Sequence, residues 1–558
     1  MGSHHLPERE SGTVTTVRMP SGPKGGAAQP AIRRLIVFTL LFVMVVVVAI
    51  GLSGLLGHLL DVGRALAASA SVDLAQGLAF TLVGGSLAVV LWAVLWRKIG
   101  DEKERSSVGW GLYLAGMSAV SLITFATSLL ITASSLVGGD WQPRTFSTGV
   151  VWAGVWAWHR WMLRHVDKSP TRLVTVSTVI SSVFGLVIGV GGAVTALGTL
   201  LGAAIDGFAA SVAVGDPWWR FTIEAPVWAV GGAVVWWWHW IHDDARHLST
   251  GFATVALVGV GVVGAVILTL GGVMTIVFVL LRLAFDRTEP TLQILDPLPW
   301  GIAAAAVGSL VWAYHRGIAI RQSDASRQAT RLTTSGVGLV AAASGIGVIV
   351  NSLLATMGTP LVGSDTRTLL LGGISALAVG GPVWWVVWKP TVLVDPIRVG
   401  STGRRIYLIA VFGLSAVVVL ITLLVIGFLV FEFVLGGVTG QSLIDRVRGP
   451  LGLLVATGLV AGYHYSVWMR DRSAIAAAPT KPKTIGHVIL VTGSDPEPLR
   501  QVIDDVTGAG VTVWLRSDVD VDGPNEDQLS HALEGVTGKR VMVITGPRAQ
   551  VDVIPLKG

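Results

Sequence analysis

Long apolar runs separated by short polar segments make up most of the chain between residues 35 and 470. A helix needs about 20 apolar residues to cross the hydrocarbon core of a bilayer. Twelve runs reach or approach this length: residues 35–60, 77–97, 108–137, 147–163, 173–205, 221–241, 251–285, 299–318, 332–360, 368–388, 406–435 and 450–468. The pattern therefore predicts an all-α integral membrane protein with about twelve transmembrane helices.

The spans alternate in length and composition, which indicates an internal repeat. Odd-numbered spans are long and rich in Gly, Ala, Ser and Thr, whereas even-numbered spans are short and carry most of the Trp. The even-numbered spans also end in similar strings, and the fourth position of this motif recurs every 63 to 80 residues. The residues at that position are Trp96, His159, His239, His315, Trp388 and His464. We expect six helical-hairpin repeats in the same orientation, related by an axis along the membrane normal.

The short Trp-rich helix, its charged exit and its long Gly-rich partner together resemble a family of bacterial membrane proteins known as domain of unknown function 5671. The resemblance covers roughly residues 35–470. It implies a multi-pass bacterial membrane protein and agrees with the predicted topology. Because the family has no established activity, the resemblance implies no function.

The distribution of basic residues predicts the orientation of the chain. Loops after the even-numbered spans hold about twice as many Arg and Lys residues as loops after the odd-numbered ones. Such an excess marks the cytoplasmic side of a membrane protein. Arg470 and Arg472 follow the last predicted span on the same side. We therefore expect a multi-pass protein of the plasma membrane with both the N-terminus and the C-terminus in the cytoplasm.

Composition agrees with lipid as the main solvent of this chain. The hydrophobic set makes up 52% of the residues and the charged set only 13%, against about 25% charged residues in soluble domains. The absence of cysteine excludes disulfides, thiolate metal sites and cysteine nucleophiles. The formal charge of +6 is typical of basic cytoplasmic loops, and we expect no nucleic-acid partner.

Two further regions flank the apolar part. Residues 1–34 are rich in Gly, Ser and Pro and are expected to form a disordered cytoplasmic tail. Residues 471–485 are predicted to be a linker, and residues 486–558 a small soluble α/β domain. In that domain, strands are expected at 487–491, 511–515, 540–545 and 550–554, and helices at 496–507 and 526–534. Alternation of strands and helices predicts parallel strand pairing.

The repeated motif supplies the first candidate site, at His159, His239, His315 and His464. One interpretation is an aromatic belt, because indole and imidazole rings have an apolar body and a polar edge and settle at headgroup depth. The other is a ring of equivalent histidines that binds a metal, a haem or an anionic headgroup, or relays protons. Trp at two of the six positions argues against a complete ring of ligands.

Polar groups inside the spans supply further candidates, because a charge at bilayer depth is costly and is often functional. Glu224 and Glu432 lie near the outer ends of their spans, and His58 and Asp140 are similar cases. Asn351 lies inside a span and is expected to bond across helices. Glycine stripes such as Gly185-xxx-Gly189 are expected to permit close helix packing.

In the C-terminal domain, Gly493, Ser494 and Asp495 follow a predicted strand and precede a predicted helix. Free backbone N–H groups at such a helix start attract anions. A complete dinucleotide or P-loop signature is missing, so a plain strand-to-helix turn is the alternative.

Three functions are compatible with these patterns. The first is a structural or regulatory membrane platform that holds a cytoplasmic domain for a protein partner. The second is a transporter or channel for a small solute or ion. The third is a membrane enzyme that binds a metal or cofactor at the motif histidines. The sequence predicts no cofactor, names no catalytic residue, and favours the platform over an enzyme.

Overall fold

The computed structural model describes residues 28–61, 67–208, 218–286, 288–357, 366–392, 402–436, 442–477, 484–516, 524–546 and 550–556. The described chain forms two compact units, a helical one that extends to Tyr465 and a C-terminal one that begins at Ser466. The predicted tail at residues 1–27 lies outside the described residues. Residues 28–34 of that tail are helical, because the first helix begins at Ala28.

The helical unit consists of long helices in pairs. Their bounds are α1 (Ala28–Leu60), α2 (Ala67–Leu78), α3 (Gly85–Lys98), α4 (Glu102–Arg105), α5 (Val108–Val137), α6 (Pro143–Arg164), α7 (Val176–Phe208), α8 (Trp218–Trp237), α9 (Gly251–Ala256), α10 (Ala265–Phe285), α11 (Thr291–Leu295), α12 (Leu298–Gln322), α13 (Asp324–Ala355), α14 (Thr366–Val392), α16 (Thr402–Val434) and α17 (Leu443–Ala477). Three π-helical segments interrupt or extend them: η1 (Ala79–Gly84), η2 (Trp238–His242) and η4 (Leu257–Gly264). Every predicted span coincides with a helical segment.

Ten helical segments of the described chain are long and apolar enough to cross a membrane. The chain is therefore a multi-pass membrane protein. The two other predicted spans, 147–163 and 221–241, correspond to α6 and to α8 with η2. These two are short and Trp-rich, and they do not reach the same combination of length and apolarity. Ten spans are supported by the structure, and twelve stays a prediction.

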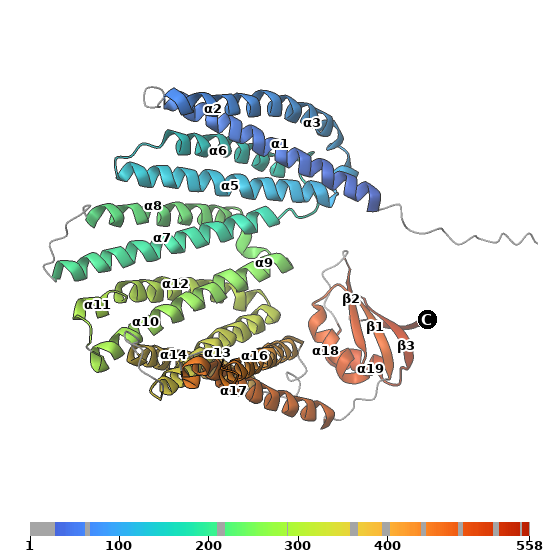
Figure 1. Ribbon diagram of the computed structural model, residues 1–558. Helices are drawn as coiled ribbons and strands as arrows, with labels where there is room; N and C mark the ends of the chain where they lie inside the picture. Colours follow the sequence, from blue (N-terminus) through green and yellow to red (C-terminus); the bar gives the residue numbers. More distant parts are fainter. Residues whose placement is uncertain are drawn as a thin grey trace, which may run out of the picture. The chain divides into compact units, whose positions relative to one another are not determined.

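Each long helix packs against a partner that follows it in the chain. The packed pairs are α1 with α2 and α3, α5 with α6, α7 with α8, α10 with α12, and α13 with α14. Helices α16 and α17 are connected by the ion pair between Glu432 and Arg446. Neighbouring pairs also contact one another, through α1 and α6, α5 and α8, α7 and α12, and α10 and α14. Figure 1 shows the pairs from α1 to α12 stacked in chain order, beginning with the blue α1.

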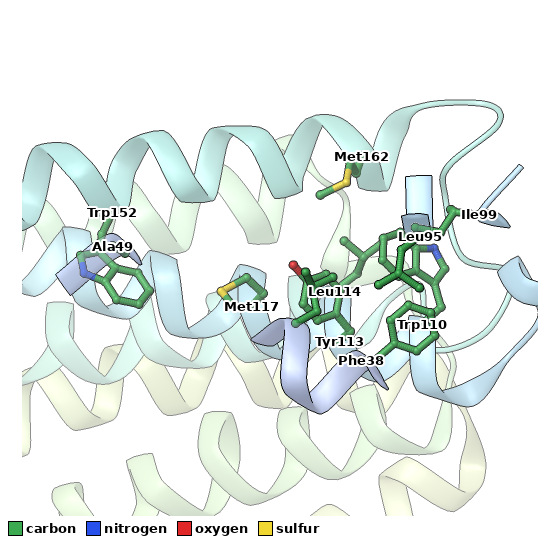
Figure 2. Close-up of a cluster of buried hydrophobic side chains, with 11 residues drawn as sticks. Phe38, Ala49, Leu95, Ile99, Trp110, Tyr113, Leu114, Met117, Trp152 and Met162 are labelled. Carbon is green, nitrogen blue, oxygen red and sulfur yellow. The ribbon is translucent and has the colours of Figure 1, made fainter. Parts of the chain in front are cut away.

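Buried side chains fill the contact between the first two pairs. Phe38 of α1, Leu95 of α3, Trp110 and Tyr113 of α5, and Met162 of α6 meet there with little or no exposure. Figure 2 shows this cluster, with the Phe38 and Trp110 rings side by side, and their centroids are 5.4 Å apart. The cluster fixes α5 and α6 against α1.

Glycine permits the closest approach between helices. A Cβ on Gly189 of α7 would lie 3.0 Å from the backbone nitrogen of Ala233 in α8, and a Cβ on Gly232 would meet the backbone of Gly189. The two backbones therefore touch where Gly185-xxx-Gly189 was expected to pack. A second glycine stripe of α7, Gly198-xxx-Gly202, differs: a Cβ on Gly198 would meet the Trp300 ring, whereas Gly202 has open space beside it.

The C-terminal unit is a four-stranded sheet in the order β2-β1-β3-β4. Its strands are β1 (Ile485–Thr492), β2 (Gly510–Leu515), β3 (Gly538–Thr545) and β4 (Val551–Leu556). Strand β1 pairs in parallel with β2 and β3, and β4 runs antiparallel to β3. The predicted linker is shorter than 471–485, because α17 extends to Ala477 and β1 begins at Ile485.

Helices α18 (Pro496–Thr507) and α19 (Glu526–Leu533) contact each other and cover one face of this sheet. Leu499, Ile503 and Leu529 pack there against Val488 and Val541. The successive side chains of a strand point to opposite faces. Residues on the other face of the sheet therefore lie away from the helices, as Figure 1 shows for the unit as a whole.

Candidate functional site

The four motif histidines are buried in the helical unit. His159, His239, His315 and His464 are each at most 3% exposed. Their neighbours Trp158, Trp238 and Tyr314 are exposed. The imidazoles thus lie inside the helix packing, whereas these Trp and Tyr side chains lie on its surface. Burial at this level corrects the expectation that the imidazoles themselves face the membrane interface.

One hydrogen bond is common to all four histidines. Each Nδ1 lies 2.7 to 2.9 Å from the carbonyl oxygen four residues earlier in its helix. A carbonyl only accepts, so Nδ1 carries the proton and Nε2 of the neutral ring is an acceptor. The tautomer is therefore the same at every position of the motif.

The surroundings of Nε2 differ from one histidine to the next. Tyr113 donates its hydroxyl to Nε2 of His159 at 2.9 Å, whereas Nε2 of His239 faces the Asp243 carboxylate at 3.9 Å. Nε2 of His315 and of His464 is buried without a hydrogen-bond partner among the described residues. In the described chain no three His, Asp or Glu residues are grouped so that they could hold a metal. The structure does not bring the four histidines into one shared ligand ring.

The histidines contact the preceding Trp-rich helix instead. The ring centroids of Trp92 and His159 are 6.4 Å apart, and those of Trp156 and His239 are 6.5 Å apart. Trp236 and His315 repeat the contact at 6.1 Å, and all three pairs meet edge to face. Edge-to-face aromatic pairs stabilise packing by about 0.5–1.5 kcal/mol each. The motif therefore connects successive Trp-rich helices.

A polar cluster lies where α6 meets η2. Arg160 and Arg164 donate to Oδ1 of Asp243 at 2.7 and 2.9 Å. The side chains of Arg160 and Asp243 are 15% and 9% exposed. A cavity of about 330 Å³ adjoins this cluster. Its lining comprises Ser118, Trp156, Arg160, Leu163, Arg164, Val174, Ser177, Thr178, Ser181, His239, His242, Asp243 and Asp244.

The carboxylate of Asp243 is held in its charged form. Burial by itself would raise the pKa of Asp243, but the hydrogen bond and charge of Arg160 outweigh it, with a smaller contribution from Arg164, and the pKa falls below its usual value. The ion pair between α6 and η2 therefore persists at neutral pH. It joins two residues that are 83 positions apart in the chain.

Among the other intramembrane candidates, the two glutamates have partners within the chain. Glu432 is paired with Arg446, as described above, and Glu224 is half-buried near the start of α8 and has interactions within the chain. Asn351 lies beside a mainly apolar cavity of about 970 Å³ between α10, α13, α16 and α17. His58 borders a smaller cavity together with Asp73 and Arg144, which form an ion pair.

In the C-terminal unit, the predicted turn residues are occupied by local bonds. Asp495 accepts from the backbone nitrogen of Glu497 at 3.1 Å and so caps α18. Ser494 bonds through its Oγ to Thr492 Oγ1 at 3.0 Å, and Gly493 lies between them. A carboxylate already at the helix start disfavours a second anion there. The geometry supports the plain turn over phosphate binding.

The uncovered face of the C-terminal sheet carries apolar side chains. The strand register places Ile489, Val491, Trp514, Met542, Ile544 and Ile554 on this face. Trp514 is 55% exposed and Ile554 43%. A sheet with parallel strands is normally covered on both faces, so this face is a candidate binding surface.

Sequence reasoning missed Tyr113, Arg160, Arg164 and Asp243. Arg160 directly follows a motif histidine, and Asp243 lies four residues after another. That spacing places Asp243 one helical turn beyond His239. It was the signal that could have singled out this carboxylate.

Comparison with known proteins gives one match. Residues 34–158 and 330–459 match the family described as Domain of unknown function (DUF5671). Each DUF5671 segment contains two consecutive helix pairs, α1 to α6 in one and α13 to α17 in the other. The predicted resemblance is confirmed for these segments, and residues 159–329 lie between them. No curated protein and no solved structure matches the chain.

Proposed function

We propose that this chain is a structural or regulatory platform of the bacterial plasma membrane, with both termini in the cytoplasm, that holds its C-terminal unit as an interaction domain. The observation that carries the proposal is the uncovered apolar face of the sheet. Soluble surfaces rarely expose a contiguous apolar patch unless something binds there. The DUF5671 helices then serve as the membrane scaffold.

The proposed scaffold has twelve spans in six repeated hairpins. Helix α6 packs along α5, and α8 packs along α7, as the other short helices pack along their long partners. The repeated contacts of Trp92, Trp156 and Trp236 with the next histidine support a common arrangement of the short helices. The two DUF5671 segments, each of two helix pairs, support repetition as well.

The occupant that best fits the open sheet face is the same face of a second copy. Arg540 pairs in register with Leu556, and Ile544 with Asp552, so Arg540 and Asp552 lie at opposite ends of the apolar strip. Four residues of strand separate them, which is about 13 Å. A two-fold axis across the strands brings Arg540 of one copy to Asp552 of the other, with the apolar residues between. Homodimer interfaces are isologous in this way.

The mass of the full-length protein in detergent, measured by light scattering during size exclusion, tests this proposal. We expect a dimer that Trp514→Glu converts to a monomer, because a carboxylate would be buried against apolar side chains. Gln501→Glu is the matched control, since it adds the same charge on the exposed side of α18 and should leave the dimer intact.

A charge reversal adds specificity to the test. Arg540→Asp alone should weaken the dimer, and Arg540→Asp combined with Asp552→Arg should restore it. A full-length protein that is monomeric at micromolar concentration would overturn the proposal. So would a dimer that persists after removal of residues 484–558, since the interface would then lie in the helical unit.

A further inference from the structure

Two residues that line the cavity between α5, α6, α7 and η2 each have a buried polar atom without a partner among the described residues. Oδ2 of Asp243 and Oγ of Ser118 are buried and have no hydrogen-bond partner in the described chain. An unmet buried polar group costs about 1–3 kcal/mol. Both residues line the same cavity of about 330 Å³, which is large enough for a small polar group.

One side of the cavity requires a hydrogen-bond donor. Nε2 of His239 and Oδ2 of Asp243 are 3.9 Å apart. Nδ1 of His239 donates to the Val235 carbonyl at 2.9 Å, so Nε2 of the neutral ring is an acceptor, as is the carboxylate oxygen. Two acceptors at this separation are satisfied by a group with several N–H bonds, such as a primary ammonium.

The other side of the cavity favours an anion. Arg160 and Arg164 bring two positive charges to one oxygen of Asp243. Asp244, which also lines the cavity, is paired with Arg246. The Arg164 side chain is 57% exposed and has further N–H groups to donate. Ser177, Thr178 and Ser181 lie in the first turns of α7 and line the cavity. Guanidinium, hydroxyl groups and a helix start together suit a phosphoryl group.

The helix ends around the cavity carry the aromatic residues typical of headgroup depth. Trp158 and Trp161 of α6 and Trp237 and Trp238 near η2 are all exposed. The Arg160 guanidinium lies 5.3 Å from the Trp156 ring and 5.7 Å from the Trp238 ring. Exposed Trp residues concentrate at the membrane interface, so the cavity lies where phospholipid headgroups are abundant.

We propose that this cavity binds a phosphoethanolamine group, with its ammonium between Asp243 and His239 and its phosphate at Arg164 and the first turn of α7. The shared chemistry is a phosphodiester beside a primary ammonium. It is supplied by a phosphatidylethanolamine headgroup or by a soluble phosphoethanolamine ester. The site is independent of the dimer proposed above.

Lipid retention by the full-length protein, measured by native mass spectrometry, tests the site. The purified protein is exchanged into nanodiscs of phosphatidylethanolamine, phosphatidylcholine or phosphatidylglycerol. We expect about tenfold stronger retention of phosphatidylethanolamine than of phosphatidylcholine, whose ammonium has no N–H to donate. Equal retention of all three lipids would overturn the proposal.

A competition arm distinguishes the two sources. If the cavity accepts the soluble ester, glycerophosphoethanolamine at millimolar concentration should displace the retained lipid. If the lipid stays bound at that concentration, the ligand of the cavity is the phosphatidylethanolamine of the bilayer. In both cases phosphatidylethanolamine binds in preference to phosphatidylcholine. Displacement by glycerophosphocholine at the same concentration would contradict the role of the ammonium.

Single-residue variants test whether the retained lipid binds at this cavity. Arg164→Gln should weaken retention of phosphatidylethanolamine about tenfold, through loss of a charge-assisted bond. Arg316→Gln is the control for loss of an arginine elsewhere, because Arg316 lies over Trp312 at 5.2 Å and does not line this cavity. Asp243→Asn should reduce the preference over phosphatidylcholine. If Asp243→Asn fails to fold, the double variant Ser177→Ala/Ser181→Ala takes its place. Normal retention of phosphatidylethanolamine in both this double variant and Arg164→Gln would overturn the proposal.

Discussion

The imidazole ring of His315 packs against Gly261 on the partner helix. A Cβ at Gly261 would lie 2.8 Å from Cδ2 of that ring, closer than a real contact. Gly261 belongs to the π-helical segment η4, and His315 belongs to α12. The glycine therefore makes the space in which the motif histidine is buried.

Gly261→Ala should destabilise the helical unit. The added methyl group forces the His315 ring or η4 to shift, and overpacking of this kind costs about 1–3 kcal/mol. Thermal unfolding in detergent measures the loss. Gly259→Ala is the control in the same segment, because nothing lies within 4 Å of a Cβ there. Equal stability of the two variants would mean that His315 does not occupy this space.

Tyr113→Phe should also lower stability, without changing the volume of the core. The variant removes the donor to His159 Nε2 and leaves a buried acceptor unmet, at a cost of about 1–3 kcal/mol. A double-mutant cycle with His159→Phe checks the bond itself. The two losses should be less than additive, whereas full additivity would show that Tyr113 and His159 act independently.

The sequence located the helices and the small sheet well, because these depend on local patterns. The predicted helix 496–507 coincides with α18, which Asp495 caps and which Gly508 ends in a left-handed conformation. The predicted strands match β1 to β4 within three residues at each end. The end of α17 at Ala477 was not predicted, since its last turns carry no apolar run.

The buried side of each helix could not be read from the sequence. In a membrane helix both the lipid-facing and the packed sides are apolar, so apolar periodicity does not separate them. His159 and Trp158 therefore looked equivalent, although one is buried and the other exposed. The pairing of Arg160 with Asp243 depends on packing between α6 and η2, which no local pattern encodes.

The contribution of the Asp243 ion pair to the stability of the folded protein should change with pH only in the acid range. Its pKa is lower in the folded protein than its ordinary value of 3.8, so its contribution is fully present above that value. As the pH falls through the folded pKa, the carboxylate is protonated and the contribution is lost. Melting temperatures of the parent protein and Asp243→Asn should therefore differ at pH 7 and converge in acid, as the pH falls through the lowered pKa of Asp243. A constant difference across this range would contradict the assignment.

Side-specific labelling should establish whether α6 and α8 cross the membrane. The chain has no cysteine, so single cysteines can be placed at exposed positions between the helices and in the last turn of α7 without further changes. With twelve spans, Asp101→Cys, Asp167→Cys and Asp244→Cys face the cytoplasm, and Asp140→Cys and Asp206→Cys face outward. A membrane-impermeant maleimide should then label only the cysteines at positions 140 and 206 in intact spheroplasts, and all five cysteines after lysis.

If α6 does not cross the membrane, the cysteines at positions 140 and 167 should be labelled to the same extent in intact spheroplasts. If α8 does not cross, the same holds for positions 206 and 244. Either result would reduce the number of spans toward the ten that length and apolarity support.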